Sequence, residues 1–303
     1  MNAKEVEREI NEMIAEGLCK IVTLDIFKSV EQLKLTDFTK EQLEETFNNY
    51  KDYLKRINDL PEDIKLAFLE MMKENEVIHN HQAENEDKFL LHLNRILTKH
   101  NSIDIGSVML EDETLNGNLT KEDMQTLHQV LLEGTSSNGP DCYKLREGNT
   151  KFVGGFINGT KWVDYIPMKD KDLPIAMDLV SEYLNKDSTN PLDTLSIPIV
   201  AHGLIAAIQA FDDGNTRLAR LIQHLKIWHL SKKFNLTYIN SPALYMSKSY
   251  YISRKDYRDN ITKIVDYLND EAWNRWFRYN LNMMDEQLFF GNQNLDKIED
   301  KLR

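Results

Sequence analysis

The sequence predicts an all-α protein, a helical bundle that carries one small β-hairpin. Only 12 glycines and 7 prolines interrupt the 303 residues, which leaves room for long helices. Apolar residues recur at helical spacing, first at Val6, Ile10 and Ile14. One stretch breaks this pattern, because β-branched and aromatic residues flank Asn158-Gly159, a strong dipeptide signal for a tight hairpin turn.

Taken in order, residues 1 to about 118 are predicted to be helical throughout. Pro61 suits the first turn of a helix over IKLAFLEMM, since the missing N–H of proline has no partner there anyway. DKFLLHLNRIL at 87–97 predicts another helix. The hairpin is expected near 152–166 and exposed, because two strands alone have no sheet to join. The later helices are predicted over IAMDLVSEYLN, 196–211, 216–233 and KDYRDNITKIVDYLND.

Composition narrows the class of protein. Apolar residues make up 41% of the chain and charged residues 28%, as in a soluble globular protein. The net charge of −12 argues against broad binding to nucleic acid or to an anionic membrane, although a local basic pocket is allowed. Two distant cysteines, no secretory leader and no long apolar run together predict a soluble protein of a reducing cytoplasm.

The segment IQAFDDGNTRLAR, residues 208–220, has the features of a phosphate-binding turn. A turn that leads into a helix offers unpaired backbone N–H groups at the positive end of the helix dipole. Gly214 lets the backbone approach a ligand closely. Arg217 and Arg220 share one helix face and can reach the same anion. Asp213 is a hard oxygen donor that suits Mg²⁺ beside phosphate.

The alternative reading of this segment is structural. Asp, Gly and Asn also form ordinary turns between helices, with the acid capping the second helix and the two arginines in solvent. Spacing alone gives the two readings about equal weight. The reason to prefer a site is that the turn, the acid and the paired arginines all occur within eight residues.

QAFDDGNTRLAR resembles the signature of the Fic family, His-x-Phe-x-(Asp/Glu)-Gly-Asn-(Gly)-Arg-x-x-Arg. TLHQVLLEG at 126–134 resembles the family's earlier core helix, and SPALYMSKSYYISRKDYRDNI resembles its later one. The resemblance covers roughly residues 120–268. It implies a Fic-type bundle with an N-terminal helical region, 1–118, and a Fic domain, 119–303, that ends in a closing helix. The residues that match the signature are Phe211, Asp213, Gly214, Asn215, Arg217 and Arg220.

The resemblance implies a protein adenylyltransferase, which transfers AMP from ATP to a hydroxyl side chain of a target protein. Asp213 would hold Mg²⁺, and Phe211 would be buried beneath the loop. The hairpin at 152–166 would be a flap that aligns a target segment by strand-like pairing. Self-modification and a homodimer also stay open. The residues expected around ATP are Phe211, Gly214, Asn215, Thr216, Arg217 and Arg220. Tyr245 or Tyr257 could flank the adenine, although aromatic residues at helical spacing are more often part of the core.

Two positions depart from the signature. Thr216 stands where glycine is common, and little loss is expected. Gln209 stands where the family has the histidine that takes the proton from the attacking hydroxyl. An amide can hold that hydroxyl by a hydrogen bond but cannot remove its proton. His202 lies seven residues earlier, about 10 Å away by helical rise, which is too far for direct transfer. The prediction is therefore phosphate binding without fast transfer.

A regulatory segment is a further candidate. HNSIDIGSVMLEDE at 100–113 is faintly similar to the family's inhibitory helix, in which a glutamate pairs with the second signature arginine. Asp104 would take the place of that glutamate opposite Arg220. An ordinary segment capped by Asp104 is the favoured reading.

Two other functions stay open beside the adenylyltransferase. The chain could be a silent module that binds a nucleotide or a partner protein. It could also be a transferase that uses a different phosphate-containing donor. Gln209 could be natural or introduced, and delivery of the protein into another cell stays open beside a cytoplasmic location.

Overall fold

The computed structural model describes residues 3–82, 103, 105–107, 118–133, 139, 141–148, 151–157 and 160–302. The helix predicted at 87–97 lies outside these residues, as does the Asn158-Gly159 turn. Most of the candidate regulatory segment 100–113, with Asp104, also lies outside them. Among the described residues, no helix combines the length and the hydropathy needed to cross a bilayer.

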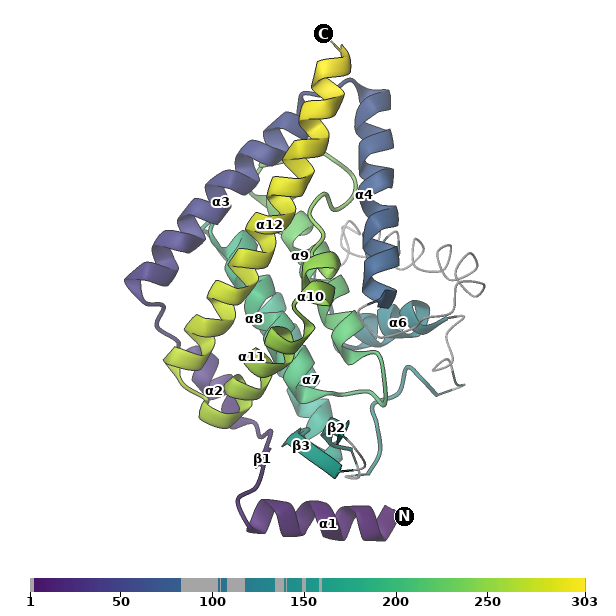
Figure 1. Ribbon diagram of the computed structural model, residues 1–303, viewed down its shortest axis with the longest axis vertical. Coiled ribbons are helices and arrows are strands. Elements are labelled where there is room, and N and C mark those ends of the chain that lie inside the picture. The colour runs from purple at the N-terminus through teal and green to yellow at the C-terminus, as the bar shows by residue number, and fades with distance from the viewer. Residues whose placement is uncertain are drawn as a thin grey trace.

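The described residues form a mostly helical fold, which confirms the predicted class (Figure 1). The strands are β1 Lys20–Ile21, β2 Val153–Ile157 and β3 Thr160–Ile166, and a 3₁₀ turn, η2, spans Asp170–Asp172. The helices are α1 Ala3–Ala15, α2 Asp25–Glu31, α3 Asp37–Asn58, α4 Glu62–Gln82, α6 Lys121–Leu132, α7 Leu173–Leu184, α8 Asp193–Ile208, α9 Asn215–Lys233, α10 Ser247–Ile252, α11 Arg254–Tyr267 and α12 Asp270–Leu302.

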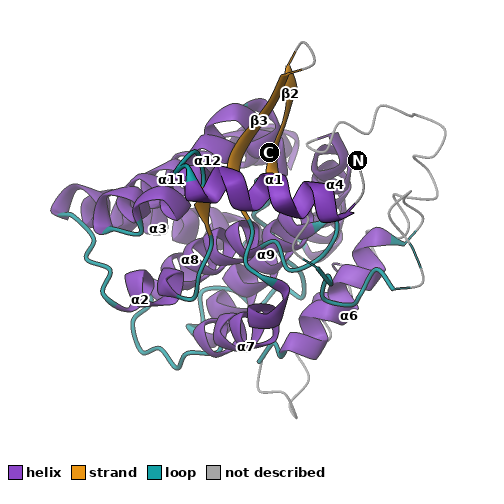
Figure 2. Ribbon diagram, turned by 90° about the horizontal axis from the view of Figure 1, so that it is seen from below, coloured by secondary structure: helices purple, strands orange, loops and turns teal. Residues whose placement is uncertain are grey.

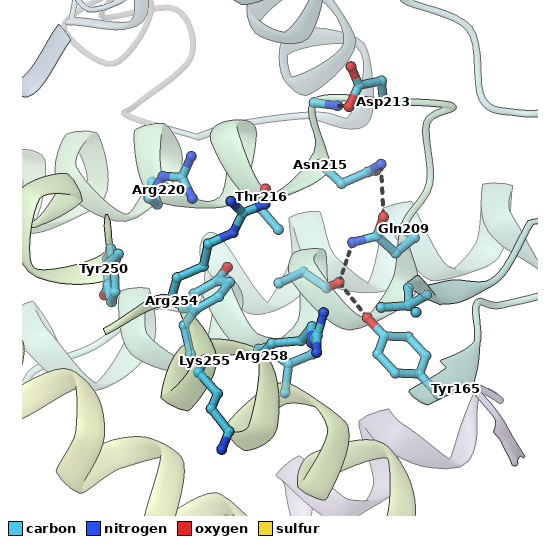
Figure 3. Close-up of a pocket in the computed structure, with 16 residues that line it drawn as sticks. Tyr165, Gln209, Asp213, Asn215, Thr216, Arg220, Tyr250, Arg254, Lys255 and Arg258 are labelled. Atoms are coloured by element: carbon cyan, nitrogen blue, oxygen red, sulfur yellow. Dashed lines mark hydrogen bonds between the residues drawn. The ribbon is translucent and has the colours of Figure 1, made fainter. Parts of the chain in front are cut away.

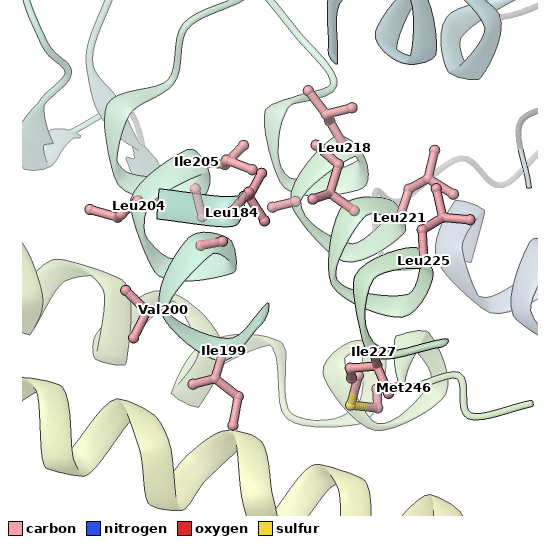
Figure 4. Packing of buried hydrophobic residues seen from close by; sticks show 14 of the residues in the cluster. Leu184, Ile199, Val200, Leu204, Ile205, Leu218, Leu221, Leu225, Ile227 and Met246 are labelled. Atoms are coloured by element: carbon pink, nitrogen blue, oxygen red, sulfur yellow. The ribbon is translucent and has the colours of Figure 1, made fainter. Parts of the chain in front are cut away.

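The centre of the fold is the pair α8 and α9, joined by the turn at 209–214. Residues 197–208 of α8 are all buried, as expected of a helix that is apolar on every side. Leu204 and Ile205 of α8 and Leu218 and Leu221 of α9 belong to one core cluster (Figure 4). Because both helices are buried along their lengths, the turn between them has a fixed frame.

The long helix α12 runs beside α3 on the outside of this core (Figure 1). Arg56 of α3 reaches Asp296 at 2.7 Å and Glu299 at 2.9 Å, both on α12. Tyr50 of α3 bonds Ser231 of α9 at 3.1 Å through their buried hydroxyl groups. These contacts join residues on the two sides of the predicted boundary at 118/119, and that boundary stays a prediction.

The hairpin does have a sheet to join, so the expectation of two isolated strands is wrong. β3 lies between β2, its antiparallel partner, and the short parallel strand β1. Apolar residues explain the third strand, because Ile10 of α1 and Cys19 pack with Ile166 of β3. The hairpin stands out from the helices beside α1 (Figure 2). The hydroxyl of Tyr165 on β3 donates to the carbonyl of Ala206 at 3.1 Å, which ties the hairpin to the end of α8.

Candidate functional site

The turn between α8 and α9 is bracketed by two residues in the left-handed conformation. Gln209 ends α8 with φ 53° and ψ 56°, and Gly214 begins α9 with φ 79°. The helix predicted to run to Phe211 therefore ends at Ile208, because a left-handed residue cannot continue a right-handed helix. A Cβ on Gly214 would also lie 2.9 Å from the ring of His128. Glycine is required there by both conformation and space.

Asn215 organises the turn through its buried side chain. Its Oδ1 accepts from the backbone N–H of Phe211 at 2.8 Å, and its Nδ2 donates to the Phe211 carbonyl at 2.8 Å. The same Nδ2 lies 3.3 Å from Oε1 of Gln209. The Nε2 of Gln209 in turn donates to the carbonyl of Ala206 at 2.7 Å. Asn215 thus fixes both the turn and the orientation of the Gln209 amide.

Side chains behind the turn hold its carbonyl groups. The ring of His128 on α6 stacks on Phe211 with centroids 3.9 Å apart, and its Nε2 lies 2.7 Å from the carbonyl of Asp213. The Nζ of Lys151 donates to the carbonyls of Phe211 and Asp212 at 2.7 and 2.8 Å. Burial lowers the pKa of Lys151 to about 8 and that of His128 to about 4. These contacts oppose the negative ends of carbonyl dipoles that would otherwise repel an anion.

Beside the turn is a cavity of about 680 Å³, a usual size for a small-molecule site. Arginine and tyrosine side chains face it from α9, α11 and the hairpin (Figure 3). It is lined by Val153, Gly154, Tyr165, Ala206, Gln209, Asp213, Gly214, Asn215, Thr216, Arg220, Tyr250, Arg254, Lys255, Tyr257, Arg258 and Ile261.

The two signature arginines lie in different places. Arg220 lines the cavity, as expected of a phosphate ligand. Arg217 does not line it. Its side chain is 1% exposed and pairs at 3.0 Å with Asp213, whose side chain is 53% exposed. This pairing with Asp213 of the turn holds the Arg217 guanidinium outside the cavity lining. The expectation that both arginines lie in solvent is wrong, because Arg220 is also only 2% exposed.

The two candidate tyrosines, Tyr245 and Tyr257, also lie in different places. Tyr257, one of the two tyrosines offered as a neighbour of the adenine, lines the cavity. Tyr245 is buried elsewhere, beside a smaller pocket that also contacts Glu76. Sequence reasoning missed Tyr250 and the cations of α11, of which Arg254 and Arg258 are four residues apart. The signal was present, since residues 254, 257, 258 and 261 recur at the spacing of one helix face and all line the cavity.

His202 is fully buried in α8, and a series of hydrogen bonds fixes the position of its ring proton. Asn280 Nδ2 donates to the Trp276 carbonyl at 2.9 Å, and Gln223 Nε2 donates to Asn280 Oδ1 at 3.1 Å. The Oε1 of Gln223 therefore faces His202 Nδ1, which donates to it at 2.5 Å. The remaining ring nitrogen accepts from the hydroxyl of Tyr257 at 2.9 Å. This series positions one cavity-lining tyrosine.

The burial of His202 predicts that the folded protein loses stability in acid. Burial lowers the pKa of His202 from 6.5 to about 3, so below pH 6.5 the unfolded chain binds a proton that the folded protein does not. The free energy of unfolding should therefore fall as the pH drops from 6.5 toward 3. Between pH 7.5 and 4.5 we expect the free energy of unfolding of His202→Gln to fall by about 3 kcal/mol less than that of the unchanged protein, measured by urea unfolding. Equal losses would contradict this prediction.

The described residues could hold Mg²⁺ only together with the phosphates of a bound nucleotide. No group of three or more histidine, cysteine or acidic residues that could hold a metal occurs in the described part of the chain. Asp213 is the one carboxylate among the described residues that line the cavity. Mg²⁺ at phosphate sites is commonly held by one or two carboxylates, the substrate phosphates and water. A single half-exposed carboxylate on a cavity that Arg220 also lines is compatible with that arrangement.

Comparison with known proteins agrees with this architecture. Three solved structures share the fold: a Fic family protein from Desulfovibrio desulfuricans G20 (16% identity, 90% of this chain and 75% of that one, TM-score 0.58), a Fic-1 fragment from C. elegans (16%, 86% and 73%, 0.58) and a Fic domain containing signaling protein from Bacteroides thetaiotaomicron VPI-5482 (12%, 84% and 98%, 0.58).

No curated protein matches the chain. The match in sequence is to a family: residues 118–226 match the Fic/DOC family, and this range includes the turn, Arg220 and α6. The match in sequence thus spans residues 118–226, and the fold shared with Fic-family structures extends over 84–90% of the chain.

Proposed function

We propose that the protein is a Fic-type adenylyltransferase that binds ATP with Mg²⁺ and transfers AMP to a hydroxyl side chain of a target protein, slowly in its present form. One observation carries this proposal: the fixed turn, Arg220 and the amide of Gln209 all face one cavity of nucleotide size. The Fic/DOC match supports it, because Fic-family proteins are typically transferases and include enzymes that transfer AMP.

The reaction needs a proton acceptor at Gln209. The oxygen of the target hydroxyl would form a bond to the α-phosphorus of ATP, and the bond from that phosphorus to the bridging oxygen would break. Pyrophosphate would leave with the bonding electrons, and the hydroxyl proton must go to a base. Gln209 stands at the position of the family's histidine, and an amide does not take up a proton near neutral pH. The described residues that line the cavity include no histidine.

The other residues of the turn would bind and orient the nucleotide. Arg220 and the start of α9 would hold the terminal phosphates by charge and by the helix dipole. Asp213 would hold Mg²⁺, which when bound neutralises phosphate charge. Asn215 would keep the Gln209 amide at the reacting end of the cavity, through the contact at 3.3 Å.

The hairpin is the proposed dock for the target protein. β3 is paired on both sides, whereas β2 pairs only with β3 among the described residues. An extended target segment could add to the other edge of β2, with main-chain hydrogen bonds setting its register. Val153 and Gly154 of β2 line the cavity, so a segment on that edge would lie near the nucleotide. Self-modification and a homodimer are compatible with this surface, and a cytoplasmic location is part of the proposal.

A second candidate is a silent binding module, or a transferase with another phosphate-containing donor. The observation that favours the module is the Gln209 side chain, whose two polar ends are both engaged, with Ala206 at 2.7 Å and Asn215 at 3.3 Å. A side chain held in this way is suited to a stable wall of a binding site rather than to proton transfer.

Calorimetric titration with ATP, in Mg²⁺ and in EDTA, tests the nucleotide part of the proposal. We expect the unchanged protein to bind ATP and the affinity to fall in EDTA, because charge on the phosphates is then less neutralised. CTP and UTP in parallel titrations test for another donor. If none of these nucleotides binds at millimolar concentration, the proposal is wrong.

A further inference from the structure

The first six residues of α11 carry three cationic and two acidic side chains, which leaves a net positive charge at the cavity. Arg254, Lys255 and Arg258 all lie within its first five residues and all line the cavity. Cations at a helix N-terminus oppose the helix dipole and destabilise the helix. Asp256 is the only acidic residue in that first turn. In a protein of net charge −12, such a cluster calls for an anionic ligand.

The three side chains of this cluster are not equivalent. Arg258 is already compensated, because its Nε lies 3.2 Å from Asp164 on β3 and its guanidinium lies 5.2 Å from the centre of the Trp162 ring. It therefore links α11 to the hairpin. Arg254 and Lys255 form no ion pair with any described residue. Of these two, only a side chain that points into the cavity could place its charge against a ligand bound there.

The side chains of Arg254 and Lys255 point in different directions. Arg254 extends toward Thr216, across the cavity from its own helix, whereas the side chain of Lys255 points away from the turn (Figure 3). Thr216 lies in the first turn of α9, the helix that also carries Arg220. Arg254 and Arg220 thus approach the same space from two helices. Arg217, which the sequence placed there, is held by Asp213 instead.

We propose that Arg254 is a second phosphate-binding arginine, opposite Arg220, and that the pair selects ligands with a chain of two or more phosphoryl groups. This inference rests on the proposed nucleotide site and names the part of the nucleotide that α11 recognises. A planar guanidinium makes paired, charge-assisted hydrogen bonds to phosphate oxygens. Two such groups on opposite walls can grip neighbouring phosphoryl groups of one chain, and a single phosphate gains less from them.

The test compares Arg254→Ala with Lys255→Ala, which removes the same charge one residue away. Calorimetry would measure the affinities for ATP, AMP and inorganic tripolyphosphate. We expect Arg254→Ala to weaken binding of ATP and tripolyphosphate about 10- to 100-fold and of AMP much less. Lys255→Ala should change each by less than about 3-fold, since exposed charges that make no direct contact contribute little. Arg254→Lys, which keeps the charge, should recover part of the loss.

The outcomes separate this inference from the proposed function. Equal effects of Arg254→Ala and Lys255→Ala would overturn the inference while ATP binding by the unchanged protein would leave the function standing. A loss of AMP affinity as large as that of ATP would also overturn it, because Arg254 would then act on the nucleoside or on folding. Binding of tripolyphosphate through Arg254, without any binding of ATP, would support the inference and reject the adenylyltransferase. If the unchanged protein binds neither, both are wrong.

Discussion

Gln209→His is expected to raise the rate of AMP transfer about 10²- to 10⁴-fold, the usual contribution of a positioned general base. The neutral imidazole would accept the proton that the amide cannot, while the phosphate ligands stay unchanged. Residue 209 has φ 53°, a left-handed conformation in which histidine is several times more frequent than most residues. The substitution should therefore fit the existing turn. Initial rates of label transfer from ATP to protein in a lysate, and to the protein itself, measure the effect.

Gln209→Asn is the matched control for this gain. Asparagine also tolerates the left-handed conformation and carries an amide, so it changes the side chain without adding a base. We expect its transfer rate to equal that of the unchanged protein. A gain with asparagine as large as that with histidine would show that the amide's contacts, rather than the missing base, limit transfer. No gain with histidine in a protein that binds ATP would favour the silent module.

Arg220→Ala and Arg217→Ala are expected to fail in different ways. Arg220 lines the cavity, so its loss should weaken ATP binding by at least about 10-fold, the effect of removing a charge-assisted contact to phosphate. Arg217 is buried and paired with Asp213 outside the lining. Its loss should reduce the free energy of unfolding by about 1–3 kcal/mol, because the substitution leaves an empty space in the interior and removes the ion pair with Asp213. Calorimetry and urea unfolding on both variants separate the two roles.

The comparison of these arginines has a clear failing outcome. If Arg217→Ala weakens ATP binding as strongly as Arg220→Ala and leaves the unfolding free energy unchanged, Arg217 is a phosphate ligand. The Asp213–Arg217 pair would then have to open when the nucleotide binds. The effect of Arg220→Ala should also shrink at high salt, because part of the attraction to phosphate is screened.

The sequence pattern was enough to predict the long helices and the two strands of the hairpin. Apolar periodicity predicted the long helices, and the strand propensities around 152–166 predicted β2 and β3. The pairing of β1 with β3 was missed, because it joins Ile21 to Ile166 across the chain and a two-residue strand has no periodicity of its own. The predicted end of α8 was three residues too late. The helix ends at a left-handed Gln209, and the sequence has no glycine at that position to indicate such a conformation.

In the candidate site too, the sequence predicted what local pattern determines and missed what tertiary packing determines. The sequence around the turn predicted which residues gather near the cavity, including Asp213, Gly214 and Arg220. It could not predict that Arg217 turns to Asp213, since spacing places both arginines on one face and leaves the choice of partner to packing. Tyr245 and Arg254 illustrate the same limit. Both lie outside the turn, and only the tertiary fold decides that Arg254 reaches the cavity and Tyr245 does not.

The most direct test of the central claim is a crystal structure of the protein with Mg²⁺ and a non-hydrolysable ATP analogue. We expect the two terminal phosphates between Arg220 and Arg254, the metal on Asp213, and the α-phosphorus facing Gln209. A nucleotide bound in the opposite direction, with its base against the turn, would contradict it. So would phosphates bound outside the cavity, because Gln209 would then have no reacting group to serve.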